Sequence, residues 1–149
     1  MKKFFFLILL MGCTVSQEIY NVSKVENQYI YEKSIKIFSG EEIYIDAEVV
    51  DNKIISYKRV DNKKHSPNTI GLSLFSNNSS NKKTSNMYVT NQFEKRLTYK
   101  AKYKQTSQNK YNNARVHPVM PKAFSGTLFQ FEVESIIFYD FEIEIEKTE

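Results

Sequence analysis

A one-by-one alternation of apolar and polar residues recurs along most of this chain and constrains its fold more than any other feature. The clearest run places Ile43, Ile45, Ala47 and Val49 on one side and acidic residues between them. Successive side chains of a β-strand point to opposite faces, so the pattern predicts a strand with one buried face and one solvated face. Residues 97–104 repeat the pattern, with lysines at the solvated positions.

About eight or nine short runs of this kind follow one another between residues 28 and 149, separated by turn signals such as Ser39-Gly40 and Asp51-Asn52. No window of a dozen residues carries the 3.6-residue period of an amphipathic helix. The chain has 149 residues, which is enough for one domain. We therefore expect a single all-β domain, a two-sheet β-sandwich of antiparallel strands, with a closed barrel as the alternative.

Two polar segments interrupt the alternation. Residues 76–86 contain only Ser, Thr, Asn and Lys, so we expect an exposed loop there, and residues 105–113 predict a second polar loop. Residues 128–145 are the most apolar stretch, and Asp140 interrupts it as a β-bulge would.

The N-terminus carries the pattern of a bacterial export signal. Two lysines precede eight unbroken apolar residues at positions 4–11, a run far shorter than the roughly 20 residues that span a bilayer. Leu10-Met11-Gly12-Cys13 resembles the lipobox that precedes a lipidated cysteine, whereas cleavage after Ser16 would fit an ordinary signal peptidase. We expect residues 1–16 to be the signal, residues 17–27 a tether or the strand that enters the domain, and residues 28–149 the β-sandwich.

The residues that carry chemistry are sparse. Cys13 is the only cysteine, so the exported domain would have neither a disulfide nor a thiol nucleophile. His65 and His117 lie in basic segments, and the four glycines are scattered, which argues against a phosphate-binding loop. Glutamates at positions 142, 144 and 146 favour a solvated strand face over a calcium loop. These features predict a protein that is not an enzyme and needs no metal or other cofactor.

One group of basic residues is a candidate binding face. The cationic stripe consists of Arg96, Lys100, Lys102 and Lys104. It could dock an anionic envelope component, such as lipid headgroups or acidic polysaccharide. Alternatively, its members pair across strands with the glutamates of the last strand. The formal net charge of +4, two units of which lie in the signal, is too small to favour nucleic acid as a partner.

Two stretches resemble a group of small exported bacterial β-sandwich proteins with an Ig-like build. Residues 87–93 followed by 97–101 are similar to that group's strand, corner and second strand, although Gln92 stands where proline is usual. The segment from Pro118 to Pro121 is similar as well, together with the strand-like spacing of Val133, Ile136, Phe138 and Phe141. The resemblance implies an Ig-like sandwich and export, and it implies no activity.

Together these features predict a non-enzymatic β-sandwich protein that is exported or anchored to the cell envelope and acts as a binding or structural module. Its partner would be an unknown protein or an anionic envelope component, and it would touch the membrane only through a lipid at Cys13. The alternative is a small secreted inhibitor or immunity-type protein that blocks a partner enzyme with the polar segment 76–86 or 105–113.

Overall fold

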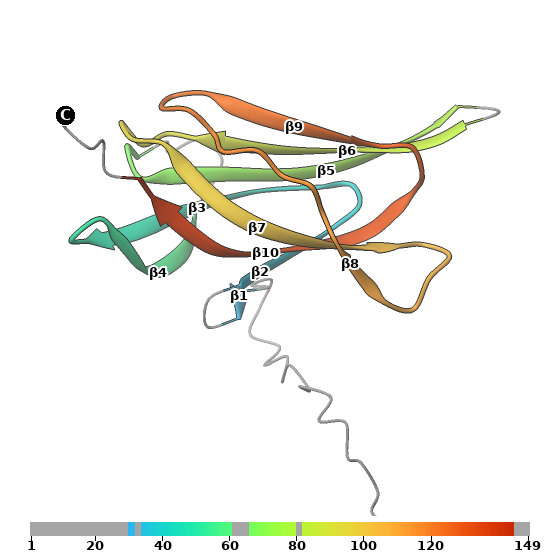
Figure 1. Cartoon of the computed structure of the whole chain (residues 1–149), viewed down its shortest axis with the longest axis horizontal. Coiled ribbons are helices and arrows are strands. Elements are labelled where there is room, and N and C mark those ends of the chain that lie inside the picture. Colours follow the sequence, from blue (N-terminus) through green and yellow to red (C-terminus); the bar gives the residue numbers. More distant parts are fainter. Residues whose placement is uncertain (1–29, 32–33, 61–65, 80–81, 145–149) are drawn as a thin grey trace, which may run out of the picture.

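The computed structural model describes residues 30–31, 34–60, 66–79 and 82–144, which form ten β-strands in two antiparallel sheets (Figure 1). The predicted all-β, two-sheet sandwich is confirmed. The ten strands exceed the expected eight or nine because two of them, β1 and β8, have only two and three residues. The predicted export signal, Cys13, the segment 17–27 and His65 lie outside the described residues.

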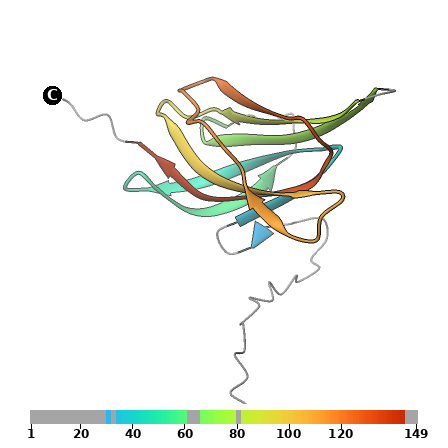
Figure 2. The same cartoon turned by 45° about the vertical axis from the view of Figure 1, so that its right-hand side comes forward.

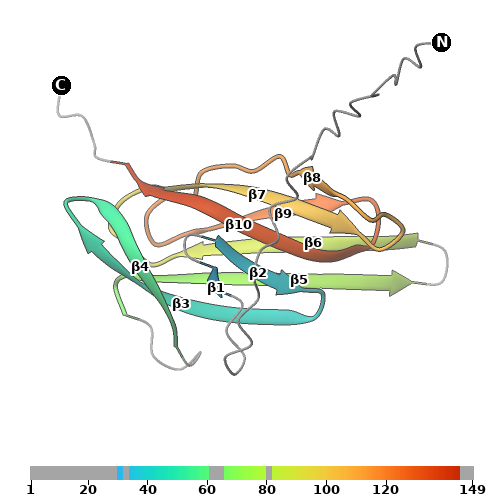
Figure 3. The ribbon, with the colours of Figure 1, turned by 90° about the horizontal axis from the view of Figure 1, so that it is seen from below.

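The first sheet has the strand order β1-β2-β10-β7-β8. Its strands are β1 (Ile30–Tyr31), β2 (Ser34–Phe38), β10 (Val133–Ile143), β7 (Leu97–Gln105) and β8 (Tyr111–Asn113). The C-terminal strand β10 is therefore central and pairs with both β2 and β7. Figure 3 looks onto this sheet from below.

The second sheet has the order β4-β3-β5-β6-β9. Its strands are β4 (Lys53–Val60), β3 (Glu41–Val50), β5 (Thr69–Ser79), β6 (Lys82–Asn91) and β9 (Phe124–Phe129). Figure 2 shows the two sheets as separate layers, with β9 at one edge of the second sheet. Within the described ranges, no helix is long and apolar enough to cross a membrane.

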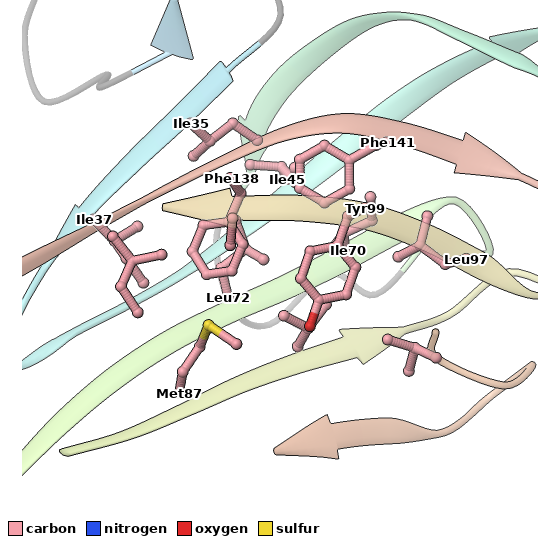
Figure 4. Close-up of a cluster of buried hydrophobic side chains, with 14 of the residues drawn as sticks. Ile35, Ile37, Ile45, Ile70, Leu72, Met87, Leu97, Tyr99, Phe138 and Phe141 are labelled. Carbon is pink, nitrogen blue, oxygen red and sulfur yellow. The ribbon is translucent and has the colours of Figure 1, made fainter. Parts of the chain in front are cut away.

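The core lies between the sheets and is built from the apolar positions of the alternating runs. Ile43, Ile45 and Ala47 of β3 are buried, as are Leu97 and Tyr99 of β7, so the inward faces predicted from the alternation are confirmed. Figure 4 shows Ile45 and Tyr99 beside Phe138 and Phe141 of β10 between the layers, and all four belong to the buried cluster. Each large apolar side chain buried in this way contributes about 1.5–3 kcal/mol to folding.

The expectation that residues 76–86 form a loop is wrong. Strands β5 and β6 continue through this segment as one antiparallel hairpin that stays in register to the pair Ser79 and Lys82. Ser76 Oγ lies 2.9 Å from Ser85 Oγ, and the buried Ser85 Oγ accepts a hydrogen bond from the backbone N–H of Val133. Backbone pairing needs no apolar side chains, and here the hydroxyls find polar partners of their own.

Asp140 interrupts strand β10 as expected. The register between β10 and β7 shifts between Tyr139 and Glu142, and Asp140 has the left-handed φ of 51°. The bulge lets the buried positions resume at Phe141 and Ile143. The polar segment 105–113 is only partly a loop, because its last three residues form β8.

Candidate interaction surfaces

The outer face of the second sheet carries a group of exposed apolar side chains. We define this apolar face by Phe75 of β5, Tyr88 of β6, and Phe124 and Leu128 of β9. Phe124 is 72% exposed and Leu128 is 56% exposed. In the register of the sheet, the half-buried Asn86 lies between Phe75 and Leu128, so the group spans three strands around it.

A glycine lets one ring of this face lie directly on the backbone. Gly126 pairs with Tyr88, and a Cβ at Gly126 would lie only 3.0 Å from Cε1 of the tyrosine ring. The Tyr88 ring therefore rests on β9, where it meets Phe124 edge-on at a centroid distance of 6.5 Å. A glycine inside a strand often marks such a close approach. Here the missing Cβ leaves room for the Tyr88 ring beside Phe124.

Sequence reasoning missed the apolar face. The alternation in β9 has the opposite sense to that of the other strands, because Phe124 and Leu128 point outward while Ser125 and Thr127 are half-buried. The signal that could have revealed this is the spacing of the two apolar residues around Gly126, since a glycine at a core position would leave a gap. Phe75 directly precedes residues 76–86, which the sequence predicts as a loop, so the sequence gives it no apolar neighbours across the sheet.

The outer face of the first sheet is charged, and the structure shows the cross-strand pairing that was one of the two alternatives for the cationic stripe. Strands β7 and β10 are neighbours. Three members of the stripe contact carboxylates of β10 or of the residue that follows it, and the pairs are Arg96–Glu144 at 3.3 Å, Lys100–Asp140 at 2.9 Å and Lys104–Glu134 at 2.8 Å. The hydrogen bond and negative charge of Asp140 raise the pKa of Lys100.

Lys102 differs from the rest of the stripe. Its Nζ lies 5.4 Å from the ring centroid of Tyr139, and among the described residues it forms no ion pair. The expected glutamate partners were also only partly the right ones: Glu144 is paired, Glu142 has no ion pair in the part of the chain described, and Glu146 lies beyond that part. Arg96, Lys100 and Lys104 together with their carboxylate partners thus form a ladder of charge pairs, which we call the charge ladder. Lys102 lies instead over the ring of Tyr139.

A groove of about 500 Å³ lies between the β3–β4 turn and the end of β10. Asp51 and Asn52 form this turn with φ values of 51° and 62°, the conformation of a two-residue hairpin turn. Tyr57 lines the groove, and burial together with the charge of Asp140 raises its pKa to about 12. At neutral pH the Tyr57 hydroxyl is therefore a neutral donor and a poor base.

The residue types that bind metal ions are not gathered in the described part of the chain. No group of three or more His, Cys, Asp or Glu side chains could hold a metal ion there. His117 is exposed on the segment that leads to β9. Tyr99 has a buried hydroxyl without a hydrogen-bond partner, and burial raises its pKa, so this hydroxyl stays protonated.

Comparison with known proteins gave no match to a family model, a curated protein or a solved structure. The fold defines the chain as an all-β sandwich protein.

Proposed function

We propose that the protein is a non-enzymatic binding module that is exported, is anchored to the cell envelope through Cys13, and contacts another protein through the apolar face. The single observation that carries this proposal is the exposure of Phe75, Tyr88, Phe124 and Leu128 together on one sheet face. Antiparallel sheets usually present polar residues on the side that faces water. Contiguous apolar patches on soluble domains commonly mark interaction sites.

The chemistry of the face suits a protein partner. Aromatic side chains are enriched at protein interfaces because they bury a large area with few rotatable bonds. Asn86 lies between Phe75 and Leu128 in the sheet register, and Thr90 pairs with Phe124, so these two half-buried residues offer polar groups for orientation. The proposed class is a sandwich of Ig-like build, a type of domain that often acts by binding.

Site-specific photo-crosslinking tests the proposed face. A photoreactive phenylalanine derivative replaces Tyr88 in the full chain, and a matched variant carries it at Lys100 on the opposite face. We expect adducts with a second, different protein from position 88 and none from position 100. Equal yields from the two positions, or no heterologous adduct from position 88, would contradict the proposal.

The anchor is tested separately. Cells that express the full chain are fed a labelled fatty acid, and Cys13→Ser should abolish its incorporation into the protein. A mature N-terminus at Gln17, measured by mass spectrometry, would sink the lipid anchor and leave a soluble exported form.

The β5–β6 hairpin favours the inhibitor or immunity-type alternative as a second candidate. Figure 1 shows the ends of these strands extending beyond the rest of the sandwich. Asn77, Asn78 and Lys82 are exposed along this arm, a shape that can enter an enzyme cleft. In the same crosslinking experiment, heterologous adducts from position 78 instead of position 88 would support this alternative.

A further inference from the structure

The backbone of β9 is unpaired along one edge. Asn91 N–H donates to the Ala123 carbonyl at 2.8 Å, and these two residues are opposite each other in the register that continues from the β6–β9 ladder. Hydrogen-bonded pairs alternate along an antiparallel ladder, so Ser125, Thr127 and Phe129 also bond to β6. The N–H and C=O groups of Phe124, Gly126 and Leu128 therefore point away from β6. Within the described residues they have no hydrogen-bond partner.

The other edge strands are protected, whereas β9 is not. The opposite edge of the same sheet, β4, carries Lys53, Lys58 and Arg59 and is offset by a bulge, and the edge strands β1 and β8 are very short. Charges, bulges and short length are the usual devices that prevent edge-to-edge pairing. Residues 123–131 contain no charged side chain. This edge thus combines free backbone groups, neutral charge and exposed apolar side chains.

We infer that β9 pairs with β9 of a second copy of this chain, antiparallel and centred on Gly126. A two-fold axis at Gly126 brings Phe124 of each copy opposite Leu128 of the other and Ser125 opposite Thr127, so residues of the same class face each other. In this register Phe124 lies opposite Leu128 of the partner subunit, with both side chains on the outer face. Gly126 lies opposite its own copy, and the free groups form about six backbone hydrogen bonds.

Charge and symmetry favour a second copy over a strand from a different protein. In the pair of β9 strands only uncharged residues face each other, and Phe124 lies opposite Leu128 of the partner subunit. Pairing would also join the two apolar faces into one surface across a sheet of two copies. The inference goes beyond the proposed function, because the dimer forms whether or not a further protein binds this surface.

A charge-swap experiment tests both the dimer and its register. Sedimentation velocity of the full chain carrying Cys13→Ser, which removes the lipid acceptor, should show a monomer–dimer equilibrium between about 1 and 200 µM, the range in which a micromolar dimer dissociates. Phe124→Lys with Leu128→Lys places lysine opposite lysine, and we expect the dimer Kd to rise about tenfold or more. Phe124→Glu with Leu128→Lys places glutamate opposite lysine, and we expect a Kd within about threefold of the parent value.

The two double variants lose the same apolar side chains, so their difference reports the charges that face each other across the β9–β9 contact and not the loss of apolar area. Ile55→Lys on the exposed β4 edge is the control and should leave the Kd unchanged, and circular dichroism should show that every variant is folded. A parent chain that stays monomeric throughout the range would overturn the inference. So would equal dimerisation by the two double variants, or loss of the dimer through Ile55→Lys. None of these outcomes depends on the heterologous adducts that test the proposed function.

Discussion

The two sheets are alike on their inner faces and opposite on their outer faces. Inside, both contribute alternating aliphatic and aromatic side chains to one core. Outside, the first sheet carries the ladder of charge pairs between β7 and β10, whereas the second carries the apolar face on β5, β6 and β9. The same kind of core is compatible with either kind of outer face. The outward residues, and not the core residues, therefore indicate what each face contacts.

The difference teaches how register is protected in each sheet. In the first sheet, a slip of one residue would turn Phe141 and Ile143 to water and separate the charge pairs. In the second sheet, β9 carries apolar residues on both of its faces. A slip of one residue would therefore cost less, and the register of β9 is less strongly fixed. A buried polar contact at the end of β6 helps to fix this register, because it binds the segment that leads into β9.

That contact is centred on Asn91, and its loss should have the largest effect. The Asn91 side chain is fully buried, donates to the carbonyls of Lys95, Val119 and Met120, and accepts the Phe93 N–H at 2.9 Å. Asn91→Ala leaves these backbone groups unpaired, so we expect the free energy of unfolding to fall by about 3 kcal/mol, as measured by urea denaturation.

Asn86→Ala is the matched control for this prediction, because it removes the same side chain from the same strand at a half-buried position of the outer face. We expect it to change the free energy of unfolding by no more than about 0.5 kcal/mol. Equal effects of the two substitutions would mean that Asn91 does not anchor β9.

The next effect has the opposite sign and lies between the sheets. The Tyr99 hydroxyl is buried and unpaired, while its ring packs on Phe141 at a centroid distance of 5.9 Å. Tyr99→Phe keeps the ring and removes the unpaired oxygen, so the protein should gain about 1 kcal/mol of stability. Tyr88→Phe on the apolar face removes an exposed hydroxyl and should leave the melting temperature within about a degree. A destabilised Tyr99→Phe variant would show that the hydroxyl has a partner.

A smaller effect depends on pH and lies at the groove beside β4. Burial and Asp140 raise the pKa of Tyr57 to about 12, above the usual value of 10.0. Between these pH values the unfolded chain has released the proton and the folded chain has kept it, so stability falls as pH rises. Tyr57→Phe should make this decline shallower in thermal unfolding measured from pH 9 upward. An unchanged slope would show that Tyr57 ionises alike in both states.

Much of the fold could be predicted because core positions obey a simple period. The burial of Ile43, Ile45 and Ala47 and the bulge at Asp140 followed from alternation and its interruption. The pairing of β7 with β10 was one of two alternatives that the opposite charges of these strands left open. The extent of β5 and β6 could not, because Ser76 and Ser85 give no apolar signal although their backbones pair. Alternation appears where one face of a strand buries apolar residues. A hairpin can also extend through backbone hydrogen bonds without such residues.

The candidate site was harder to predict for a related reason. Phe124 and Leu128 have the composition of core residues, and only the sheet register places them on the outer face of β9. The cationic stripe, by contrast, was visible in the sequence, but its carboxylate partners depend on the bulge. Asp140, which breaks the run of apolar residues in the sequence, contacts Lys100 across the strands.

The smallest effects are expected on the charge ladder, where two lysines of one strand can be compared. Lys104 contacts Glu134 at 2.8 Å, whereas Lys102, two residues away, forms no ion pair within the described ranges. Lys104→Glu should cost about 0.5 kcal/mol at low salt and less at high salt, and adding Glu134→Lys should restore the loss. Lys102→Glu should leave stability unchanged at both salt concentrations.

If the stripe also docks an anionic envelope component, Lys102→Glu should weaken binding to vesicles that contain anionic lipid while the melting temperature is kept. Weaker binding together with lost stability would instead mean that Lys102 takes part in the charge ladder as Lys104 does. The charged face would then be fully paired within the protein, unlike the exposed apolar face of the second sheet.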